Sequence, residues 1–284
     1  MNYRHIYHAG NFADVLKHTV LALLLEHLRR KDTPFVVLDT HAGIGRYDLS
    51  SIEAGKTREY ESGIARLLAA PDLPPELAPY LDVVRALNPE AGPLRWYPGS
   101  PRVARSLMRP SDRLILAELH PEDAVTLKRE FRGDRQVAVH HQDAYQSLKA
   151  HLPPKEKRSL VLVDPPFETP DEFARMVAGL KAAHKRWPTG QYALWYPIKE
   201  RALIWRFHQA LEDAAIPKTL AVELTILPED DPFRLSGCGM ILVNPPWQLD
   251  ITLGRVLPAL HRALGAPAGG GRVEWIVPDP SSRQ

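Results

Sequence analysis

The sequence predicts an α/β fold built on a mostly parallel sheet. Apolar, strand-like runs alternate with helical patterns along most of the chain, and this order is typical of a parallel sheet with helices on both faces. The first such run leads directly into a glycine-rich turn, FVVLDTHAGIGRY. The length of 284 residues and the 44% share of hydrophobic residues suit one α/β domain that carries an insertion.

An amphipathic helix is expected at the start of the chain. Asn11 is the expected N-cap, and apolar residues then recur at helical spacing as far as Leu28. Three basic residues close the last turn. The first strand follows at residues 35–38 and ends in the glycine-rich turn.

Residues 47–97 are expected to form a helical insertion. Two helical patterns, ESGIARLL and PPELAPYLDVVRAL, are bounded by prolines, and no strand signal lies between them. Connections between the strands of α/β units are usually much shorter, so we expect this segment to be a subdomain. The core is then made of residues 1–46, with the first helix and strand, and residues 98–284, which end in a short tail.

The rest of the chain alternates regularly. Ser100 and Pro101 are expected as the N-cap and the first residue of a helix that ends at Leu107. Further helices are expected over residues 121–131, 171–186 and 199–214. With the first strand, six more strand-like runs predict a seven-stranded sheet: 113–119, 136–141, 159–164, 192–197, 219–227 and 238–244.

The last strand of this sheet is expected to be antiparallel. Only PEDDPFRLSG separates Leu227 from Cys238, whereas a parallel return needs about a dozen residues or more. Beyond this strand, APAGGGR is expected to be a loop and PDPSSRQ a frayed tail.

Two similar motifs, VLVDPPFE and ILVNPPWQ, end two of the predicted strands. In an open α/β sheet, ligands bind beyond the carboxyl ends of the parallel strands. Asp164 follows a parallel strand and faces that edge, whereas Asn244 follows the antiparallel strand and faces the opposite edge. We therefore expect Asp164 to belong to a functional site and NPPW to be a rigid turn with a packed tryptophan.

Polar residues and glycines also follow the other parallel strands. The first strand is followed by Asp39, His41 and Gly43, the next ends in Glu118, and Asp143 follows the third. A glycine turn permits close backbone approach, and an acid on the following strand can bind ribose hydroxyls. The turn lacks the G-x-G-x-x-G spacing of a dinucleotide site and the G-K-[ST] ending of a phosphate loop. With D-P-P-F, this pattern resembles the class I S-adenosylmethionine-dependent methyltransferases that act on amino nitrogens.

The D-P-P-F motif suits an adenine amine as the methyl acceptor. The lone pair of that amine is delocalised into the ring, so two acceptors on its N–H bonds are needed to rehybridise it. The Asp164 carboxylate and the carbonyl of Pro165 can be these acceptors, because consecutive prolines stiffen the turn and contribute no competing N–H. Phe167 would stack on the base. Positioning and electrostatics supply most of the rate of such a transfer, so no metal is expected.

Several motifs together resemble one family more closely. They extend from residue 3 to about residue 278 and read YRHIYHAGNFADVLKHTVL, DTHAGIGRY, YPGSP, ELHP, DPPFE, ALWYP and GMILVNPPW. They are similar to the RlmJ family of 23S rRNA adenine-N6 methyltransferases, and the N-terminal stretch is the most specific of them. The resemblance implies a Rossmann-like class I methyltransferase fold, S-adenosyl-L-methionine as the cofactor and one adenine of 23S rRNA as the target.

The resemblance also implies roles for individual residues. Asp164 is implied as the catalytic acid, and Tyr3, His5 and Lys17 lie in an N-terminal motif that approaches the active site, where Tyr3 is implied to contact RNA. Many members carry tyrosine where this chain has Phe167, a change that keeps stacking and removes a hydroxyl. The implied cofactor contacts are His18, His41, Ser100, Glu118, Asp143 and Ala144.

Composition limits the setting without identifying a substrate. No apolar run is long enough for a membrane span and none at the start suits a signal peptide, so we expect a cytoplasmic protein. The single cysteine, Cys238, is expected to be a buried hydrophobe. A net charge of +2 neither requires nor excludes a nucleic acid, because phosphate binding depends on local charge. Lys17 is the preferred candidate for a phosphate contact, and the expected partner is 23S rRNA, free or in early assembly, bound by a monomer.

Two alternatives remain open from the sequence alone. D/N-P-P-aromatic motifs also serve adenine-N6 DNA methyltransferases and protein-glutamine methyltransferases, and the ordinary composition of the insertion does not separate these from an RNA enzyme. A non-catalytic RNA-binding or assembly module is the other alternative. Such a module is expected to lose Asp164 or the glycine turn, and both are intact.

Overall fold

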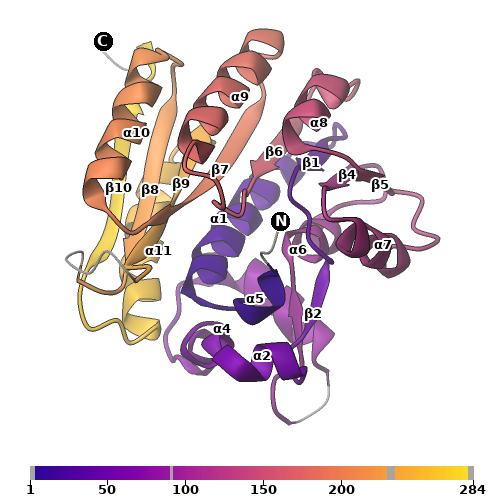
Figure 1. The fold of residues 1–284 in the computed structure, drawn as a ribbon, viewed down its shortest axis with the longest axis vertical. Coiled ribbons are helices and arrows are strands. Elements are labelled where there is room, and N and C mark those ends of the chain that lie inside the picture. The colour runs from indigo at the N-terminus through magenta and orange to yellow at the C-terminus, as the bar shows by residue number, and fades with distance from the viewer. Residues whose placement is uncertain (1–3, 90–91, 229–233, 281–284) are drawn as a thin grey trace.

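The computed structural model describes residues 4–89, 92–228 and 234–280. At its centre is an eight-stranded sheet in the order β10-β8-β9-β7-β6-β1-β4-β5 (Figure 1). Strands β5, β4, β1, β6 and β7 are mutually parallel, which confirms the mostly parallel, Rossmann-like class I methyltransferase arrangement. The strands are β1 (Val36–Asp39), β4 (Arg113–Glu118), β5 (Val137–His141), β6 (Ser159–Val163), β7 (Gln191–Ile198), β8 (Thr219–Thr225), β9 (Gly237–Val243) and β10 (Gly270–Val277).

Strand β9 is antiparallel to both of its neighbours, as predicted. Its last residue, Val243, lies opposite Tyr192 near the start of β7 and opposite Thr219 at the start of β8. The NPPW motif therefore leaves the sheet at the amino ends of the parallel strands.

The sheet has eight strands and not the seven that the sequence predicts. The additional strand, β10, pairs antiparallel with β8 along the edge of the sheet, from Gly270 opposite Thr225 to Val277 opposite Thr219. The prediction of a loop was wrong here because the strand begins in glycines and continues with polar residues. An edge strand pairs with one neighbouring strand only and its side chains are partly exposed, so it forms without the apolar run of a central strand.

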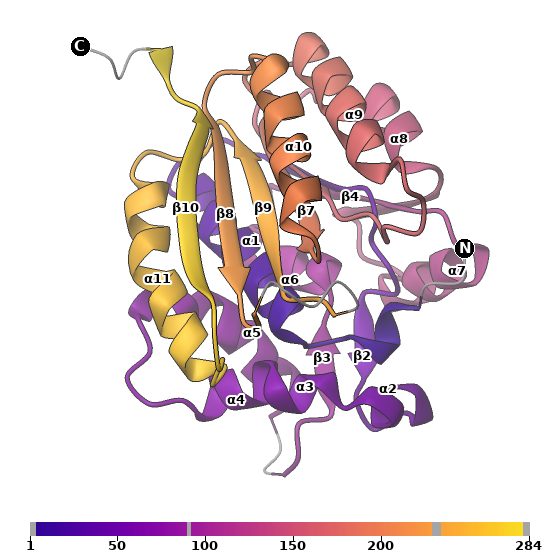
Figure 2. The same cartoon turned by 60° about the vertical axis from the view of Figure 1, so that its left-hand side comes forward.

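Helices cover both faces of the sheet. One face carries α1 (Phe12–Arg29), α6 (Ser100–Leu107), α7 (Pro121–Glu130) and α11 (Leu249–Ala263). The other carries α8 (Ala144–His151), α9 (Glu172–Arg186) and α10 (Arg201–Asp213). Figure 2 shows α10 and α11 on opposite sides of the outer strands. No prediction covers α8 and α11. Within the described ranges, no helix is long and apolar enough to cross a membrane.

The N-caps of two helices, α1 and α6, were predicted from the sequence. Asn11 caps α1 as predicted, because its Oδ1 accepts hydrogen bonds from the N–H groups of Ala13 and Asp14 at 2.9 and 3.0 Å. The prediction of Ser100 as an N-cap is wrong, because Gly99 is the N-cap of α6. The Ser100 hydroxyl is used elsewhere, in the pocket described below.

A long excursion connects β1 to α6. Its ends, β2 and β3, pair antiparallel although no strand was predicted there, so the chain leaves and re-enters the core at one place. Gly63 lies against the N-terminal segment, where a Cβ would come within 2.1 Å of Gly10 O, so a residue without a side chain is required. In order, the excursion contains β2 (Arg46–Asp48), α2 (Ile52–Thr57), α3 (Glu59–Ser62), α4 (Ile64–Ala69), the 3-10 helix η2 (Pro75–Leu77), α5 (Ala78–Leu87) and β3 (Trp96–Pro98).

Candidate active site

A pocket of about 720 Å³ lies at the carboxyl ends of β1, β4, β6 and β7. The 3-10 helix η1 (His5–Tyr7) and the start of α1 also border it. Apart from Tyr3, which lies outside the described residues, every residue predicted for the site contributes to its lining. The edge of the sheet chosen from the sequence is therefore the edge where the pocket lies.

Glu118 fixes the glycine turn at one end of the pocket. Its carboxylate accepts hydrogen bonds from the N–H groups of Gly43 and His120, both at 2.7 Å. Burial raises the pKa of Glu118. Gly43 has a φ of +58°, and a Cβ there would lie 2.3 Å from the hydroxyl oxygen of Tyr47. The turn therefore requires glycine and brings bare backbone to the pocket wall.

Asp39 is the last residue of β1, directly before the same turn, and is fully buried. It accepts hydrogen bonds from the Ser100 hydroxyl at 2.6 Å and from the His41 N–H at 3.2 Å. Burial raises its pKa to about 7 in spite of these bonds. Asp39 thus joins the end of β1 to the start of α6.

Asp143 and Ala144 form the adjoining wall of the pocket. Asp143 Oδ1 caps α8 by accepting from the N–H groups of Tyr145 and Gln146, both at 3.0 Å. Its other oxygen, Oδ2, lies 4.0 Å from a guanidinium nitrogen of Arg175. Leu119, directly after β4, is 50% exposed and also lines the pocket, a contribution that the sequence did not reveal.

His18 offers an unsatisfied nitrogen to the pocket. Its Nδ1 lies 2.7 Å from the Tyr97 hydroxyl, whereas its buried Nε2 has no hydrogen-bond partner among the described residues. Burial lowers the pKa of His18 to about 3, so the ring is neutral at physiological pH. A buried polar atom without a partner at a pocket wall can be satisfied by a polar group of a ligand.

Asp164 lies at the opposite end of the pocket, directly after β6. Its backbone N–H donates to His41 Nδ1 at 3.2 Å, so His41 carries its own proton on Nε2. Burial lowers the pKa of His41 to about 4, which agrees with this neutral form. The side chain of Asp164 is mostly covered and still lines the pocket.

Lys17 holds Asp164 from α1. Its Nζ lies 2.6 Å from Asp164 Oδ2 and 2.8 Å from Asp14 Oδ1, and Asp14 Oδ2 lies 2.9 Å from His5 Nε2. Burial would lower the pKa of Lys17, but the two carboxylates outweigh it and hold the pKa well above its ordinary value. Within the described residues, Asp164 Oδ1 has no hydrogen-bond partner. Lys17 is thus paired with two carboxylates, and the role of Asp14 was not predicted.

Phe167 lies beside Asp164 in a strained backbone conformation. Its φ is +51°, a region that side chains other than glycine rarely adopt. Its ring packs edge-on against Phe173, with centroids 4.8 Å apart, and against Trp195 at 5.9 Å. Trp195 also lines the pocket, which the apolar run ALWYP alone did not indicate.

Asn244 lies away from this pocket, as predicted. Its side-chain amide donates to the carbonyls of Pro188 and Gly190, both at 2.8 Å, just before β7 begins. Its φ of +53° suits asparagine. The tryptophan of this motif is not packed as expected, because Trp247 is 83% exposed.

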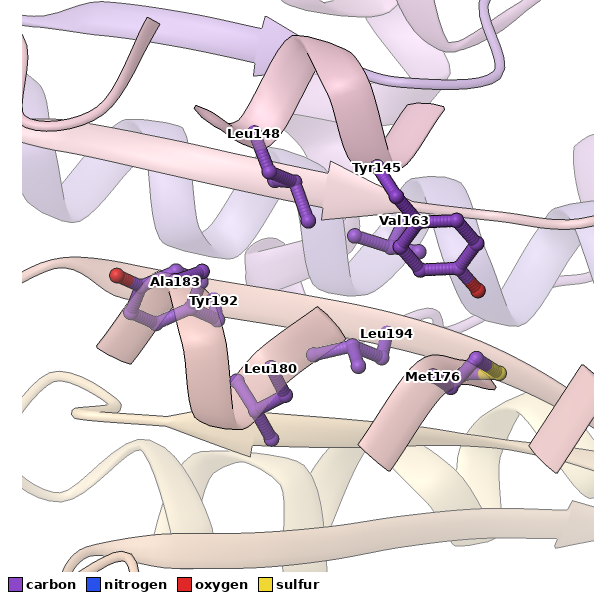
Figure 3. A pocket seen from close by; sticks show the side chains of 8 residues that line it. All are labelled: Tyr145, Leu148, Val163, Met176, Leu180, Ala183, Tyr192 and Leu194. Carbon is purple, nitrogen blue, oxygen red and sulfur yellow. The ribbon is translucent and has the colours of Figure 1, made fainter. Parts of the chain in front are cut away.

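A second, much smaller cavity lies on the α8 and α9 side of the sheet (Figure 3). Its volume is about 10 Å³, so it has room for one water at most and offers that water almost no polar partners. It is a packing gap and not a ligand site. The side chains around it are Tyr145, Leu148, Val163, Met176, Leu180, Ala183, Tyr192 and Leu194. Among the described residues, no group of three or more His, Cys, Asp or Glu side chains could hold a metal ion.

Similar proteins match the chain over most of its length. A family model described as "Ribosomal RNA large subunit methyltransferase D, RlmJ" matches residues 32–277. Two relatives are named ribosomal RNA large subunit methyltransferase J. The relative from Escherichia coli K12 is 49% identical and that from Haemophilus influenzae Rd 45% identical, each over 98% of this chain and 100% of the relative. The crystal structure of a Legionella pneumophila protein is 35% identical with a TM-score of 0.87, and the match covers 94% of this chain and 98% of that protein.

Proposed function

The chain belongs to the RlmJ family of ribosomal RNA large subunit methyltransferases, and from this premise we propose that it methylates the exocyclic N6 of one adenine in 23S rRNA. We further propose S-adenosyl-L-methionine as the methyl donor. The observation that carries the proposal is the position of Asp164, which has an unpaired Oδ1 and shares one pocket with Glu118 and Asp143. Family membership favours RNA over DNA or a protein amide as the substrate.

The chemistry of the pocket fits S-adenosylmethionine. Gly43 brings bare backbone to the pocket wall, and the unpartnered Nε2 of His18 is available to a polar ligand group. We assign Glu118 to the ribose hydroxyls, Asp143 and Ala144 to the adenine, and His18, His41 and Ser100 to the remainder of the cofactor. Leu119 would pack on the adenine ring. When bound, the cofactor supplies a methyl group made electrophilic by the sulfonium.

Asp164 and Pro165 would prepare the acceptor amine. Asp164 Oδ1 would accept one N–H bond and the Pro165 carbonyl the other, which localises the lone pair on N6. Lys17 occupies Oδ2, so it would fix the orientation of the carboxylate. The amine loses one proton when the N–C bond forms, and we assign Asp164 as its acceptor. His5 acts through Asp14 on Lys17, which makes it a positioning residue.

Phe167 would hold the target base. Its edge-on packing against Phe173 and Trp195 fixes the ring at the pocket wall, and a base that stacks on it gains about 1 to 3 kcal/mol. An adenine inside a folded RNA must leave its stack to reach Asp164, so this contact would offset part of the cost of flipping. Tyr3 is assigned to RNA by the resemblance alone.

Methyl transfer to purified RNA tests the proposal. The protein, in EDTA, is incubated with methyl-labelled S-adenosylmethionine and 23S rRNA from cells that lack the gene. We expect N6-methyladenosine in the digested RNA by mass spectrometry, and none with the Asp164→Asn variant. Transfer to another atom, or a requirement for added zinc, would contradict the proposal.

The nature of the substrate needs a second comparison. We propose that free or early-assembly 23S rRNA is preferred, that the chain acts as a monomer and that it acts in the cytoplasm. Initial rates on protein-free 23S rRNA and on assembled large subunits test the first point, and sedimentation of the active protein tests the second. Faster methylation of DNA or of a protein glutamine than of RNA would favour the alternative enzymes.

A further inference from the structure

A strongly cationic surface lies next to the pocket, outside the glycine turn. It is formed by the tip of the β2–β3 pair, the exposed side of α6 and the C-terminal end of α7 with the following turn. We call it the α7 basic surface. Its members are Arg46, Arg95, Arg102, Arg105, Lys128, Arg129, Arg132 and Arg135.

Contacts between these elements make the surface continuous. Arg46 and Arg102 both pair with Glu130 at the end of α7, Arg46 at 3.3 Å. Arg105 pairs with Asp134 at 2.6 Å. Segments that are far apart in the sequence thus present their cations side by side.

Charge is strongly concentrated here. Among the described residues, the eight cations contact three carboxylates, those of Asp48, Glu130 and Asp134, which leaves an excess of five positive charges within this set. The whole chain has 36 Lys and Arg against 34 Asp and Glu, a net charge of +2, so the remainder of the molecule is net negative. Solvation of a helical face does not require such segregation, whereas binding of a polyanion does.

Half of these cations have no ion-pair partner within the part of the chain that the structure describes. Lys128, Arg129, Arg132 and Arg135 are exposed and form no ion pair with any described residue. Two charges would suffice to complement the C-terminal dipole of α7, and Arg132 and Arg135 lie beyond that helix. These four side chains are therefore free to bind an external anion.

The neighbouring arginines are held in place by an aromatic ring. The guanidinium carbons of Arg46 and Arg95 lie 4.5 and 4.9 Å from the centre of the Trp96 ring. Stacking of this kind restrains the planar guanidinium and leaves N–H donors at its edge for phosphate oxygens. The surface thus combines cations that are held by contacts within the protein with cations that form no ion pair with a described residue.

The surface is connected to the pocket through the glycine turn. An added Cβ at Gly45 would lie 3.1 to 3.2 Å from Leu127, Glu130 and Phe131, so the turn packs directly on the end of α7. Gly43 of the same turn lines the pocket. A nucleic acid on the surface therefore lies beside the glycine-turn end of the pocket, and its base would reach Asp164 across the pocket.

From these observations we propose that the α7 basic surface binds the sugar-phosphate backbone of the rRNA helix that carries the target adenine. This inference rests on the proposed function for the identity of the RNA. A-form helices present phosphates and 2′-hydroxyls in a regular array, which proteins bind largely through shape and charge. The surface supplies affinity and register, and Asp164 and Phe167 receive the base.

Two charge-matched triple variants test the proposal. The first, Arg129→Ala/Arg132→Ala/Arg135→Ala, removes three unpaired cations from the surface. The control, Lys149→Ala/Lys181→Ala/Lys185→Ala, removes three exposed cations from α8 and α9 on the other face of the sheet. Affinity for a 23S rRNA fragment that contains the methylated adenine is measured by filter binding over a range of salt concentrations.

We expect the first variant to bind this RNA at least about tenfold more weakly and to lower the slope of log Kd against log salt by about one per lost phosphate contact. Its KM for RNA should rise, with kcat, cofactor affinity and Tm near those of the parent protein. The control should change RNA affinity less than about twofold, which is the effect of net charge alone.

Equal losses in the two variants would overturn the proposal. So would binding to vesicles of anionic phospholipid that depends on the same three arginines as strongly as RNA binding does, because the surface would then suit a membrane. The binding assay is independent of methyl transfer. RNA binding that depends on the surface without any methylation would contradict the proposed function alone, and normal methylation by the first variant would contradict this inference alone.

Discussion

Lys17 Nζ lies between two carboxylates, 2.6 Å from Asp164 Oδ2 and 2.8 Å from Asp14 Oδ1, and the Asp14 carboxylate is fully buried. This pairing connects the first helix of the chain to the end of β6 across the pocket. It leaves Asp164 one oxygen for a substrate and fixes the other. A single lysine therefore couples the stability of the fold to the orientation of the candidate catalytic carboxylate.

Removal of this lysine should destabilise the protein strongly. Lys17→Met leaves the buried Asp14 carboxylate and the mostly covered Asp164 carboxylate without this cation, and the loss of one partner of a buried ion pair typically costs about 3 to 5 kcal/mol. Addition of Asp14→Asn should recover part of this loss, because it removes one of the unpaired charges. Urea unfolding of the parent, single and double variants measures both effects. A double variant that is less stable than Lys17→Met would contradict this electrostatic explanation.

The two prolyl motifs should respond differently to alanine. Asp164→Ala should abolish methyl transfer and leave the Kd for S-adenosylmethionine nearly unchanged, because Asp164 belongs to the acceptor end of the pocket. Asn244→Ala should keep its activity and lose about 1 to 2 kcal/mol of stability. The variant loses two side-chain hydrogen bonds to backbone carbonyls, and alanine suits the left-handed backbone conformation less well than asparagine. Calorimetry, transfer assays and melting curves compare them. Equal loss of turnover at equal Tm would show that Asn244 also takes part in the reaction.

The parallel core of the fold could be predicted because its strands are buried on both faces. All five residues of β6 are buried, so the strand is a continuous apolar run in the sequence. No residue of β10 is fully buried, the strand begins at a glycine, and its polar residues hide the pattern. Strands β2 and β3 have three residues each, too few to show a periodicity.

The acids at the strand ends could be predicted for a similar reason, since the carboxyl ends of parallel strands meet at one edge. Glu118 and Asp164 needed only the strand assignments. The contact between Lys17 and Asp164 joins residues 147 positions apart and depends on how α1 packs on the sheet, which periodicity does not determine. The same holds for the α7 basic surface, because its cations come from separate segments.

Asp39 should make stability depend on pH. Its folded pKa of about 7 lies above its ordinary value of 3.8, so the folded state binds the proton more tightly than the unfolded state. The stability that this proton contributes is fully present below about pH 4 and is lost as the pH rises through about 7. Asp39→Asn keeps one oxygen that can accept from the His41 N–H and places its NH2 against the Ser100 hydroxyl, which can accept, and it does not titrate.

The stability of the parent relative to Asp39→Asn should therefore fall as the pH is raised from about 5 to about 8. Urea unfolding of both proteins at several pH values in this range measures the difference, and groups that titrate equally in the two proteins cancel. A difference that stays constant, or that rises with pH, would show that Asp39 is ionised throughout.

Phe167 separates stacking from hydroxyl chemistry, because phenylalanine has the ring of tyrosine and lacks its hydroxyl. If the ring holds a flipped base, Phe167→Tyr should keep kcat/KM within a few fold, whereas Phe167→Ala should lose about 1 to 3 kcal/mol of transition-state stabilisation, or roughly one to two powers of ten. The alanine variant also loses ring contacts with Phe173 and Trp195, so some loss of Tm is expected.

Phe173→Leu is the matched control, because it disturbs the same ring cluster at a residue that does not line the pocket. The loss at Phe167 should appear in kcat/KM for RNA with cofactor affinity unchanged, and should exceed that of Phe173→Leu at similar Tm. Full turnover by the alanine variant would remove Phe167 from the mechanism.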